Sequence, residues 1–133
     1  MVTVSDTDLL ASALAALNPR RLSATAKAGD VGCALTTATG VLHIGVSIDV
    51  ACGIGFCAEH SAIASMITAG ESQIIRFVAV SRNRNVLSPC GRCRELICQV
   101  DPANGDARVM LPGAKVVALR DLLPDHWLLN QQW

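Results

Sequence analysis

The chain has 133 residues, of which 51% are hydrophobic, 17% are charged and 3% are aromatic, and its formal net charge is zero. This length fits one domain, so we expect a single domain over residues 1–133, and the apolar fraction excludes a disordered chain. The balance of 11 basic and 11 acidic residues excludes the basic surface typical of nucleic-acid-binding proteins and argues against attraction to an anionic membrane. The low charged fraction has two interpretations of equal weight: part of the surface faces another subunit, or the chain is a compact monomer rich in small apolar residues.

Residues 1–8 carry acidic side chains where an export signal would be basic. No apolar run approaches the roughly 18 residues of a membrane span. We therefore expect a cytoplasmic protein. In that reducing compartment the six cysteines indicate metal binding or catalysis rather than a set of disulfides.

The pattern of apolar residues and chain breakers predicts an alternation of helices and strands. The first helix is expected over residues 6–17, with Ser5 as its cap, Asp8 at the capping-box position and Asn18-Pro19 at its end. The remaining expected elements, in chain order, are a loop over 20–29, strands over 31–38 and 41–47 joined by a turn at 39–40, a loop over 49–55, a helix over 57–69, a strand over 74–81, a helix over 90–100, short strands over 108–111 and 115–118, and a helical turn over 119–123. This order predicts an α/β fold with one mixed sheet flanked by helices, in which the nearly continuous apolar strand 74–81 is central.

Three cysteines and one glutamate form the most informative pattern. Cys90 and Cys93 have Cys-x-x-Cys spacing at a helix start behind Pro89, and Cys57 lies at another helix start, two residues before Glu59. A helix N-terminus lowers the pKa of a thiol, so two such starts facing each other can hold three thiolates around one ion. Structural zinc sites usually have four protein ligands, whereas catalytic ones have three and a water, so this set favours catalytic zinc.

The sequence Cys-Ala-Glu at residues 57–59, followed by Ser-Pro-Cys-Gly-Arg-Cys-Arg at residues 88–94, resembles the zinc-dependent cytidine deaminases of the small homotetrameric type. The resemblance extends over roughly residues 31–127 and includes the ending Leu-Leu-Pro at 122–124. A cysteine rather than a histidine as the first ligand is similar to the branch of this family that acts on free nucleosides.

The resemblance implies a three-layer α/β/α cytidine-deaminase-like domain with a mixed central sheet, a homotetramer, and one Zn²⁺ per subunit on Cys57, Cys90 and Cys93. It also implies a mechanism in which Glu59 takes a proton from zinc-bound water, the hydroxide attacks C4 of cytosine, and Glu59 then protonates N3 and the departing ammonia. The backbone carbonyl of Ser88 would orient the water or the leaving amine.

Two parts of the family's pattern are missing, and both concern substrate binding. Ser47 and Asp49 stand where the family has the longer Asn and Glu that bind the ribose hydroxyls, so they either contact the sugar or cap a loop. The family's stacking aromatic is also absent, which leaves as candidates Phe56, Phe77, Trp127 and Trp133. Blasticidin-S deaminase also lacks the full ribose pattern and is similar in its Ser-Pro-Cys-Gly-Arg-Cys-Arg motif. We therefore expect cytidine or deoxycytidine as the substrate, with a modified cytosine nucleoside such as blasticidin S as the alternative.

Several further residues have both a functional and a structural interpretation. His60, Arg92 and Arg94 either support the zinc-bound sulfur atoms by hydrogen bonds or are solvated charges. Trp127 either packs in its own chain or caps the pocket of a neighbouring subunit. Cys33, Cys52 and Cys98 are expected to be buried structural cysteines, and His43 and His126 are expected to be either structural or exposed.

Two other functions use the same motifs. A non-catalytic zinc module would need a fourth ligand, and no cysteine or histidine lies at the usual spacing. A nucleic-acid-editing deaminase would need a basic channel, which the balanced charge does not supply, so we expect neither a nucleic-acid partner nor a membrane partner.

Overall fold

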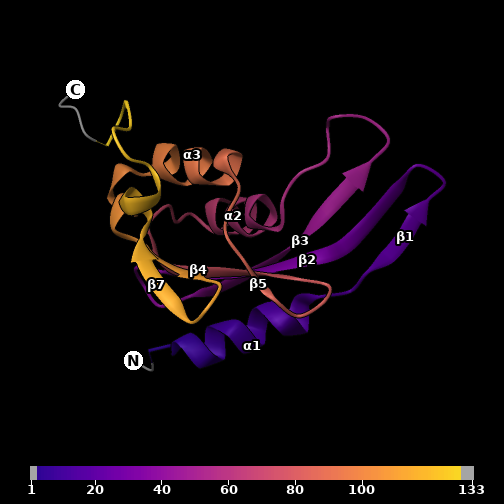
Figure 1. Ribbon diagram of the computed structural model, residues 1–133, viewed down its shortest axis with the longest axis horizontal. Helices are drawn as coiled ribbons and strands as arrows, with labels where there is room; N and C mark the ends of the chain where they lie inside the picture. Colours follow the sequence, from indigo (N-terminus) through magenta and orange to yellow (C-terminus); the bar gives the residue numbers. More distant parts are fainter. Residues whose placement is uncertain (1–2, 130–133) are drawn as a thin grey trace.

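The structure is a computed structural model that describes residues 3–129, and these residues form three layers (Figure 1). Helix α1 (Asp6–Ala16) covers one face of a seven-stranded sheet, and helices α2 (Ala58–Thr68) and α3 (Gly91–Val100) cover the other. The strands are β1 (Arg20–Ser23), β2 (Ala26–Thr37), β3 (Leu42–Val50), β4 (Ile74–Ser81), β5 (Val86–Leu87), β6 (Arg108–Leu111) and β7 (Lys115–Ala118). Short 3₁₀ helices follow α3 and β7, namely η1 (Pro102–Asp106) and η2 (Leu119–Leu122). The expected α/β/α architecture is thereby confirmed.

The long strand β2 organises the sheet because three strands pair with it. Strand β3 runs antiparallel along one edge of β2, whereas β1 and β4 share the other edge, β1 beside its start and β4 beside the remainder. The sheet continues from β4 through β6 to β7, and the β4–β6 pair is parallel, which makes the sheet mixed. Strand β4 therefore lies between β2 and β6 with most of its side chains buried, which confirms the central place predicted from its apolar sequence.

The prediction of a loop over residues 20–29 is wrong. Strand β1 forms a hairpin with the first residues of β2, with Arg20 opposite Ala28. All four β1 residues are exposed, so no alternation of apolar and polar residues marks this strand, and backbone pairing with β2 forms it. The first residues of β2 also pair with the end of β3, where Ala26 lies opposite Val50. Asp49 is therefore part of β3, although the sequence predicted a loop there. The two-residue strand β5 and the 3₁₀ helix η1 are also absent from the elements predicted above.

Two glycines allow the helices to approach the sheet closely. A Cβ atom at Gly45 of β3 would lie 2.3 Å from the backbone nitrogen of Ala62 and 2.7 Å from the carbonyl oxygen of Ala58, both on α2. On the opposite face, a Cβ atom at Gly32 of β2 would lie 2.4 Å from the carbonyl oxygen of Ala13 on α1. These contacts set the distance between each helix and the sheet.

The helices are held by caps and by an apolar core on each face. The Ser5 hydroxyl accepts a hydrogen bond from the Asp8 backbone N–H at 3.1 Å and donates one to the Asp8 carboxylate at 2.8 Å, which confirms the predicted cap. Leu9 and Ala13 of α1 pack on one side of the sheet, and the larger cluster with α2 and α3 lies on the other. Among the described residues, no helix has the length and hydrophobicity to cross a membrane.

Asn104 of η1 connects the end of α3 to the start of β4. Its side chain is fully buried, and its Oδ1 accepts a hydrogen bond from the Ile74 backbone N–H at 2.7 Å. Its Nδ2 donates to the carbonyl oxygens of Ser72 at 3.0 Å and Ile97 at 2.9 Å. One amide thus satisfies three backbone groups from three segments, which fixes α3 relative to the sheet.

We expect the substitution Asn104→Ala to lower the free energy of unfolding by about 2–4 kcal/mol, because it leaves buried backbone groups without partners. Urea denaturation with the metal content held equal measures this change. The control is Ser12→Ala, which removes a partly exposed helix-surface hydroxyl and should change the free energy by less than about 0.5 kcal/mol. Equal stability of the two variants would show that the buried amide is not a structural link.

Candidate active site and metal centre

Three cysteine sulfur atoms meet where α2 and α3 begin. Cys57 is the N-cap residue of α2 and Cys90 is the N-cap residue of α3, and neither sulfur is used in a capping hydrogen bond. Cys93 lies in the first turn of α3 and is buried. The Sγ atoms of Cys57 and Cys90 are 3.4 Å apart, and those of Cys90 and Cys93 are 3.3 Å apart. The structure therefore brings together the three cysteines that the spacing singled out.

The pKa values of these thiols show the electrostatic cost of crowding them. Burial, followed by the neighbouring Cys90, raises the pKa of the Cys57 thiol. Burial and the Glu59 carboxylate raise the pKa of the Cys93 thiol well above its usual range. Burial also acts against ionisation of Cys90, but backbone N–H groups in the first turn of α3 contribute to holding its pKa below the usual value. Three thiolates at this place therefore require a cation.

The donor set fits a zinc ion. The three sulfur atoms all lie within 4.8 Å of one another, and zinc prefers thiolate ligands in a tetrahedral arrangement. Cys57 and Cys90 also line an open cavity, so an ion held by these sulfur atoms would border it. We propose Cys57, Cys90 and Cys93 as the zinc ligands.

Glu59 lies beside this trio, in the first turn of α2. Its side chain is only 5% exposed and lines the same cavity as Cys57 and Cys90. Burial raises the pKa of its carboxyl group above the usual value, a direction that suits a group that both accepts and returns a proton near neutral pH. Because Glu59 follows Cys57 by two residues on one helix start, the helix fixes the acid next to the sulfur atoms.

The cavity has a volume of about 310 Å³, which lies within the range of small-molecule pockets. Five of the predicted substrate-binding or supporting residues line it: Ser47, Asp49, Phe56, Ser88 and Arg92. Sequence reasoning missed the apolar wall formed by Val31, Ala79 and Leu87, which come from β2, β4 and β5. Small apolar residues on strands carry no motif, and only the strand pairing identifies them as a wall.

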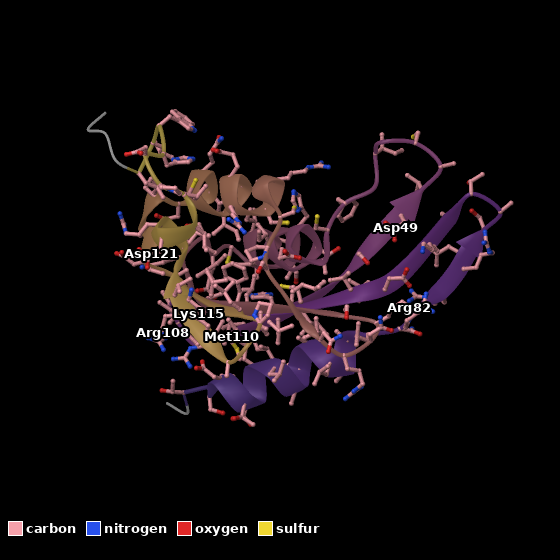
Figure 2. All side chains as sticks on the ribbon, viewed as in Figure 1. Asp49, Arg82, Arg108, Met110, Lys115 and Asp121 are labelled. Carbon is pink, nitrogen blue, oxygen red and sulfur yellow. The ribbon has the colours of Figure 1, made fainter. Side chains whose placement is uncertain are left out.

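Ser47 and Asp49 occupy different environments although both point from β3 towards the cavity. Ser47 is buried, and its hydroxyl oxygen accepts a hydrogen bond from the Val31 backbone N–H at 3.0 Å. This bond lies where the β2–β3 register shifts, between Ala28 and Gly32, so Ser47 supports the irregular part of β2. Because the Ser47 oxygen accepts this bond, its O–H group can still donate one. Asp49 is exposed near the end of β3 (Figure 2), and no ion pair of its carboxylate occurs among residues 3–129.

The three residues expected to support the sulfur atoms have different contacts. The Nδ1 atom of His60 lies 3.5 Å from Cys93 Sγ. Arg92 donates to the carbonyl oxygen of Gly55 at 3.4 Å, and Arg94 donates to the carbonyl oxygens of Pro89 and Leu122. Both guanidinium groups thus have carbonyl partners, and no hydrogen bond from either to a sulfur atom occurs in the described part of the chain.

Two of the other aromatic candidates, Phe77 and Trp127, do not line the cavity. Phe77 is 2% exposed within the core, so it is not available to stack on a base. Trp127 is 47% exposed and donates its indole N–H to Glu95 on α3, and it does not line the cavity of its own chain. Trp133 lies outside the described residues. Phe56 is therefore the one aromatic residue that lines this cavity within residues 3–129.

The histidines and cysteines expected to be structural divide into two groups. Cys33 and Cys98 are fully buried, and His43 and His126 are buried. Cys52 is exposed in the segment between β3 and α2, so the expectation that it packs as a buried thiol is wrong. Cys52 has few neighbours in this turn and is followed by Gly53, so its side chain lies in solvent.

A second cluster, Glu95, Cys98 and His126, also brings three ligand-type atoms within 4.8 Å of one another. Its hydrogen bonds do not favour a metal, because the Nδ1 atom of His126 accepts the backbone N–H groups of Leu128 at 3.1 Å and Leu129 at 3.3 Å. The proton of the neutral ring is therefore on Nε2, which donates to Glu95 Oε1 at 2.8 Å. Burial, followed by the Glu95 carboxylate, raises the pKa of Cys98 to about 11, so this thiol stays protonated. We call this cluster the C-terminal lock, because it fastens the end of the described chain to α3.

Comparison with known proteins agrees with this geometry. The family model described as the cytidine and deoxycytidylate deaminase zinc-binding region matches residues 5–105. The chain is 38% identical to blasticidin-S deaminase of Bacillus cereus over 81 residues, which are 54% of this chain and 58% of that protein. It is 28% identical to cytidine deaminase of Mycobacterium tuberculosis over 102 residues, which are 75% of this chain and 74% of that protein.

A solved structure shares the fold as well. The crystal structure of cytidine deaminase from Mycobacterium leprae superimposes with a TM-score of 0.76 at 30% sequence identity, covering 91% of this chain and 99% of that one. The family model covers more than half of the chain and includes all three cysteines and the glutamate of the cavity. The chain therefore belongs to the cytidine and deoxycytidylate deaminase family of zinc-dependent hydrolases, which act on C–N bonds.

Proposed function

We propose that this protein hydrolyses the 4-amino group of a free cytosine nucleoside, cytidine or deoxycytidine, to give the uracil nucleoside and ammonia. The observation that carries the proposal is that Glu59 and two of the three clustered cysteines line one cavity of nucleoside size. A structural zinc site would not need a buried acid facing an open cavity.

The residues have separate roles in this reaction. A zinc ion, when bound by the three sulfur atoms, supplies the Lewis acidity that activates water at neutral pH. Glu59 accepts the proton of the attacking water, delivers it to N3 of the base, and later moves a proton to the departing amine, which leaves as ammonia as the C4 carbonyl forms. The backbone carbonyl of Ser88, at the rim of the cavity, orients the water or the amine.

The walls of the cavity support a nucleoside as the substrate. Phe56 offers a ring for the base, and the isolated bridge between Phe56 and Ile48 fixes its backbone next to β3. The Ser47 hydroxyl and the Asp49 carboxylate are the donor and acceptor for sugar hydroxyls. Blasticidin S is the second candidate, because the match to blasticidin-S deaminase has 38% identity whereas the match to the mycobacterial cytidine deaminase has 28%.

We further propose that the chain forms a homotetramer in the cytoplasm. Leu42 and Ile44 lie on one face of the edge strand β3 and are 39% and 51% exposed, which is typical of a surface that another subunit covers. In such an assembly the exposed Trp127 would reach the cavity of a neighbouring subunit. All six cysteines are free thiols, which fits a reducing compartment. A monomer in light scattering would contradict the tetramer.

The two clusters of ligand-type residues give a test of the zinc site. We expect the wild-type protein to contain one zinc ion per chain, Cys90→Ser to contain none, and Cys98→Ser to keep one, because Cys98 belongs to the C-terminal lock. Elemental analysis after gel filtration measures the content. If Cys98→Ser lost its zinc and Cys90→Ser kept it, the metal would belong to the C-terminal lock and the proposed ligands would be wrong.

The role of Glu59 is tested by Glu59→Gln. We expect the rate of ammonia release to fall by about 10²–10⁴-fold, the usual contribution of a general acid–base group, while zinc content and fold are kept. The matched control is Glu71→Gln, a carboxylate that bonds Thr37 and Thr39 outside the cavity and should leave the rate unchanged. Unaltered deamination in the Glu59 variant would leave a non-catalytic zinc module as the better explanation.

Asp49 is tested on a panel of cytidine, deoxycytidine and blasticidin S. We expect Asp49→Ala to raise KM for cytidine about 3–10-fold with kcat nearly unchanged, since one hydrogen bond to the sugar is lost, and Asp49→Glu to retain the wild-type KM. Asp30→Ala, which removes a partly buried carboxylate that pairs with Lys27 and does not line the cavity, is the control. Turnover of blasticidin S with none of cytidine by the wild-type enzyme would reverse the order of the two substrates.

A further inference from the structure

Arg94 joins the zinc-binding turn to the C-terminal part of the chain. It lies in the first turn of α3, directly after Cys93, and its side chain is partly buried. Its Nε atom donates to the carbonyl oxygen of Pro89 at 2.8 Å, and its Nη1 atom donates to the carbonyl oxygen of Leu122 at 3.1 Å. One planar guanidinium group thereby fixes two backbone segments at the separation set by its own geometry.

The carbonyl of Pro89 matters because it immediately precedes Cys90. The turn that carries Cys90 has no capping side chain of its own, since Cys90 stands at the N-cap position and makes no capping bond. Pro89 is buried and has no N–H to hold it through a backbone hydrogen bond. The hydrogen bond from Arg94 crosses this turn, from the residue after Cys93 to the residue before Cys90.

The Nη1 atom of Arg94 bonds to a C-terminal segment that other contacts hold in place. Leu122, Leu123 and Leu129 pack against the main core. The C-terminal lock, in the next turn of the chain, holds the segment to α3 through His126 and Glu95 at 2.8 Å. The carbonyl of Leu122 is therefore a fixed point against which the zinc-binding turn can be held.

We propose that Arg94 is a positioning residue for the metal: it holds the Cys90–Cys93 turn against the C-terminal segment and so slows the release of zinc. Arg94 contacts neither the substrate cavity nor a sulfur atom among the contacts of residues 3–129, so it acts through the backbone of Pro89. The inference depends on the proposed ligands Cys57, Cys90 and Cys93. It concerns the retention of the ion and not the reaction itself.

The test compares Arg94→Lys and Arg94→Gln with Arg120→Lys in the full-length, zinc-loaded protein. Lysine keeps the charge but cannot place two donors in the guanidinium plane, and glutamine also loses the charge. Arg120 belongs to the same C-terminal segment, where it pairs with Asp106 at 3.0 Å. Its side chain makes no hydrogen bond or ion pair with the zinc-binding turn among residues 3–129, so it is the matched control.

The measurements are the rate at which a chromogenic chelator removes zinc from the folded protein and the visible spectrum of the cobalt(II)-substituted protein. We expect both Arg94 variants to release zinc about 10–100-fold faster than wild type and to show altered cobalt–thiolate bands, with the Arg120 variant unchanged. Circular dichroism confirms that each variant is folded at the temperature used, and Arg94→Lys serves if Arg94→Gln does not fold.

Zinc release at the wild-type rate and an unchanged cobalt spectrum in folded Arg94→Lys would overturn the inference. This result differs from failure of the proposed function. If the wild-type protein bound no zinc, or Glu59→Gln stayed active, the site assignment itself would fail. If the wild-type enzyme holds zinc and deaminates normally but the Arg94 variants retain zinc equally well, only the positioning role is lost.

Discussion

Mutual repulsion among three ionised sulfur atoms is the constraint on which the site depends. Sulfur atoms 3.3–3.4 Å apart cannot all carry charge unless a cation lies among them, and burial of Cys93 makes the penalty larger. Helices α2 and α3 both begin beside these sulfur atoms, and backbone N–H groups in the first turn of α3 favour ionisation of Cys90. The closeness of the ligands therefore follows from how two helices are set on one face of the sheet (Figure 1).

The sequence was most informative where chemistry and local structure coincide. The cysteines and Glu59 occur in short segments in which the spacing, the helix start and the ligand chemistry all agree, and the structure brings them together. Helices and apolar strands also follow from local patterns, as the central strand β4 shows. By contrast, β1 and the start of β2 are polar and exposed, so only their pairing with each other and with β3 reveals them.

The parts that the sequence could not reveal are hydrogen bonds between distant segments. Asn104 joins η1 to β4 and α3, Ser47 supports the irregular part of β2, and Arg94 joins the zinc-binding turn to η2. None of these residues stands in a pattern that predicts its partner, because each partner is a backbone group whose position depends on the whole fold. The same reason explains the C-terminal lock, in which His126 and Cys98 lie 28 positions apart in sequence.

The close packing at Gly45 has a consequence for how this sequence can change over time. Ile44, one residue earlier on β3, is 51% exposed in the single chain, so its side chain does not set the spacing between β3 and α2. At position 45 even one methyl group would displace the start of α2, and with it the proposed base Glu59 and the proposed ligand Cys57. Two adjacent positions of one strand thus constrain the protein differently, because at position 45 the distance between a helix and a strand depends on the absence of a side chain.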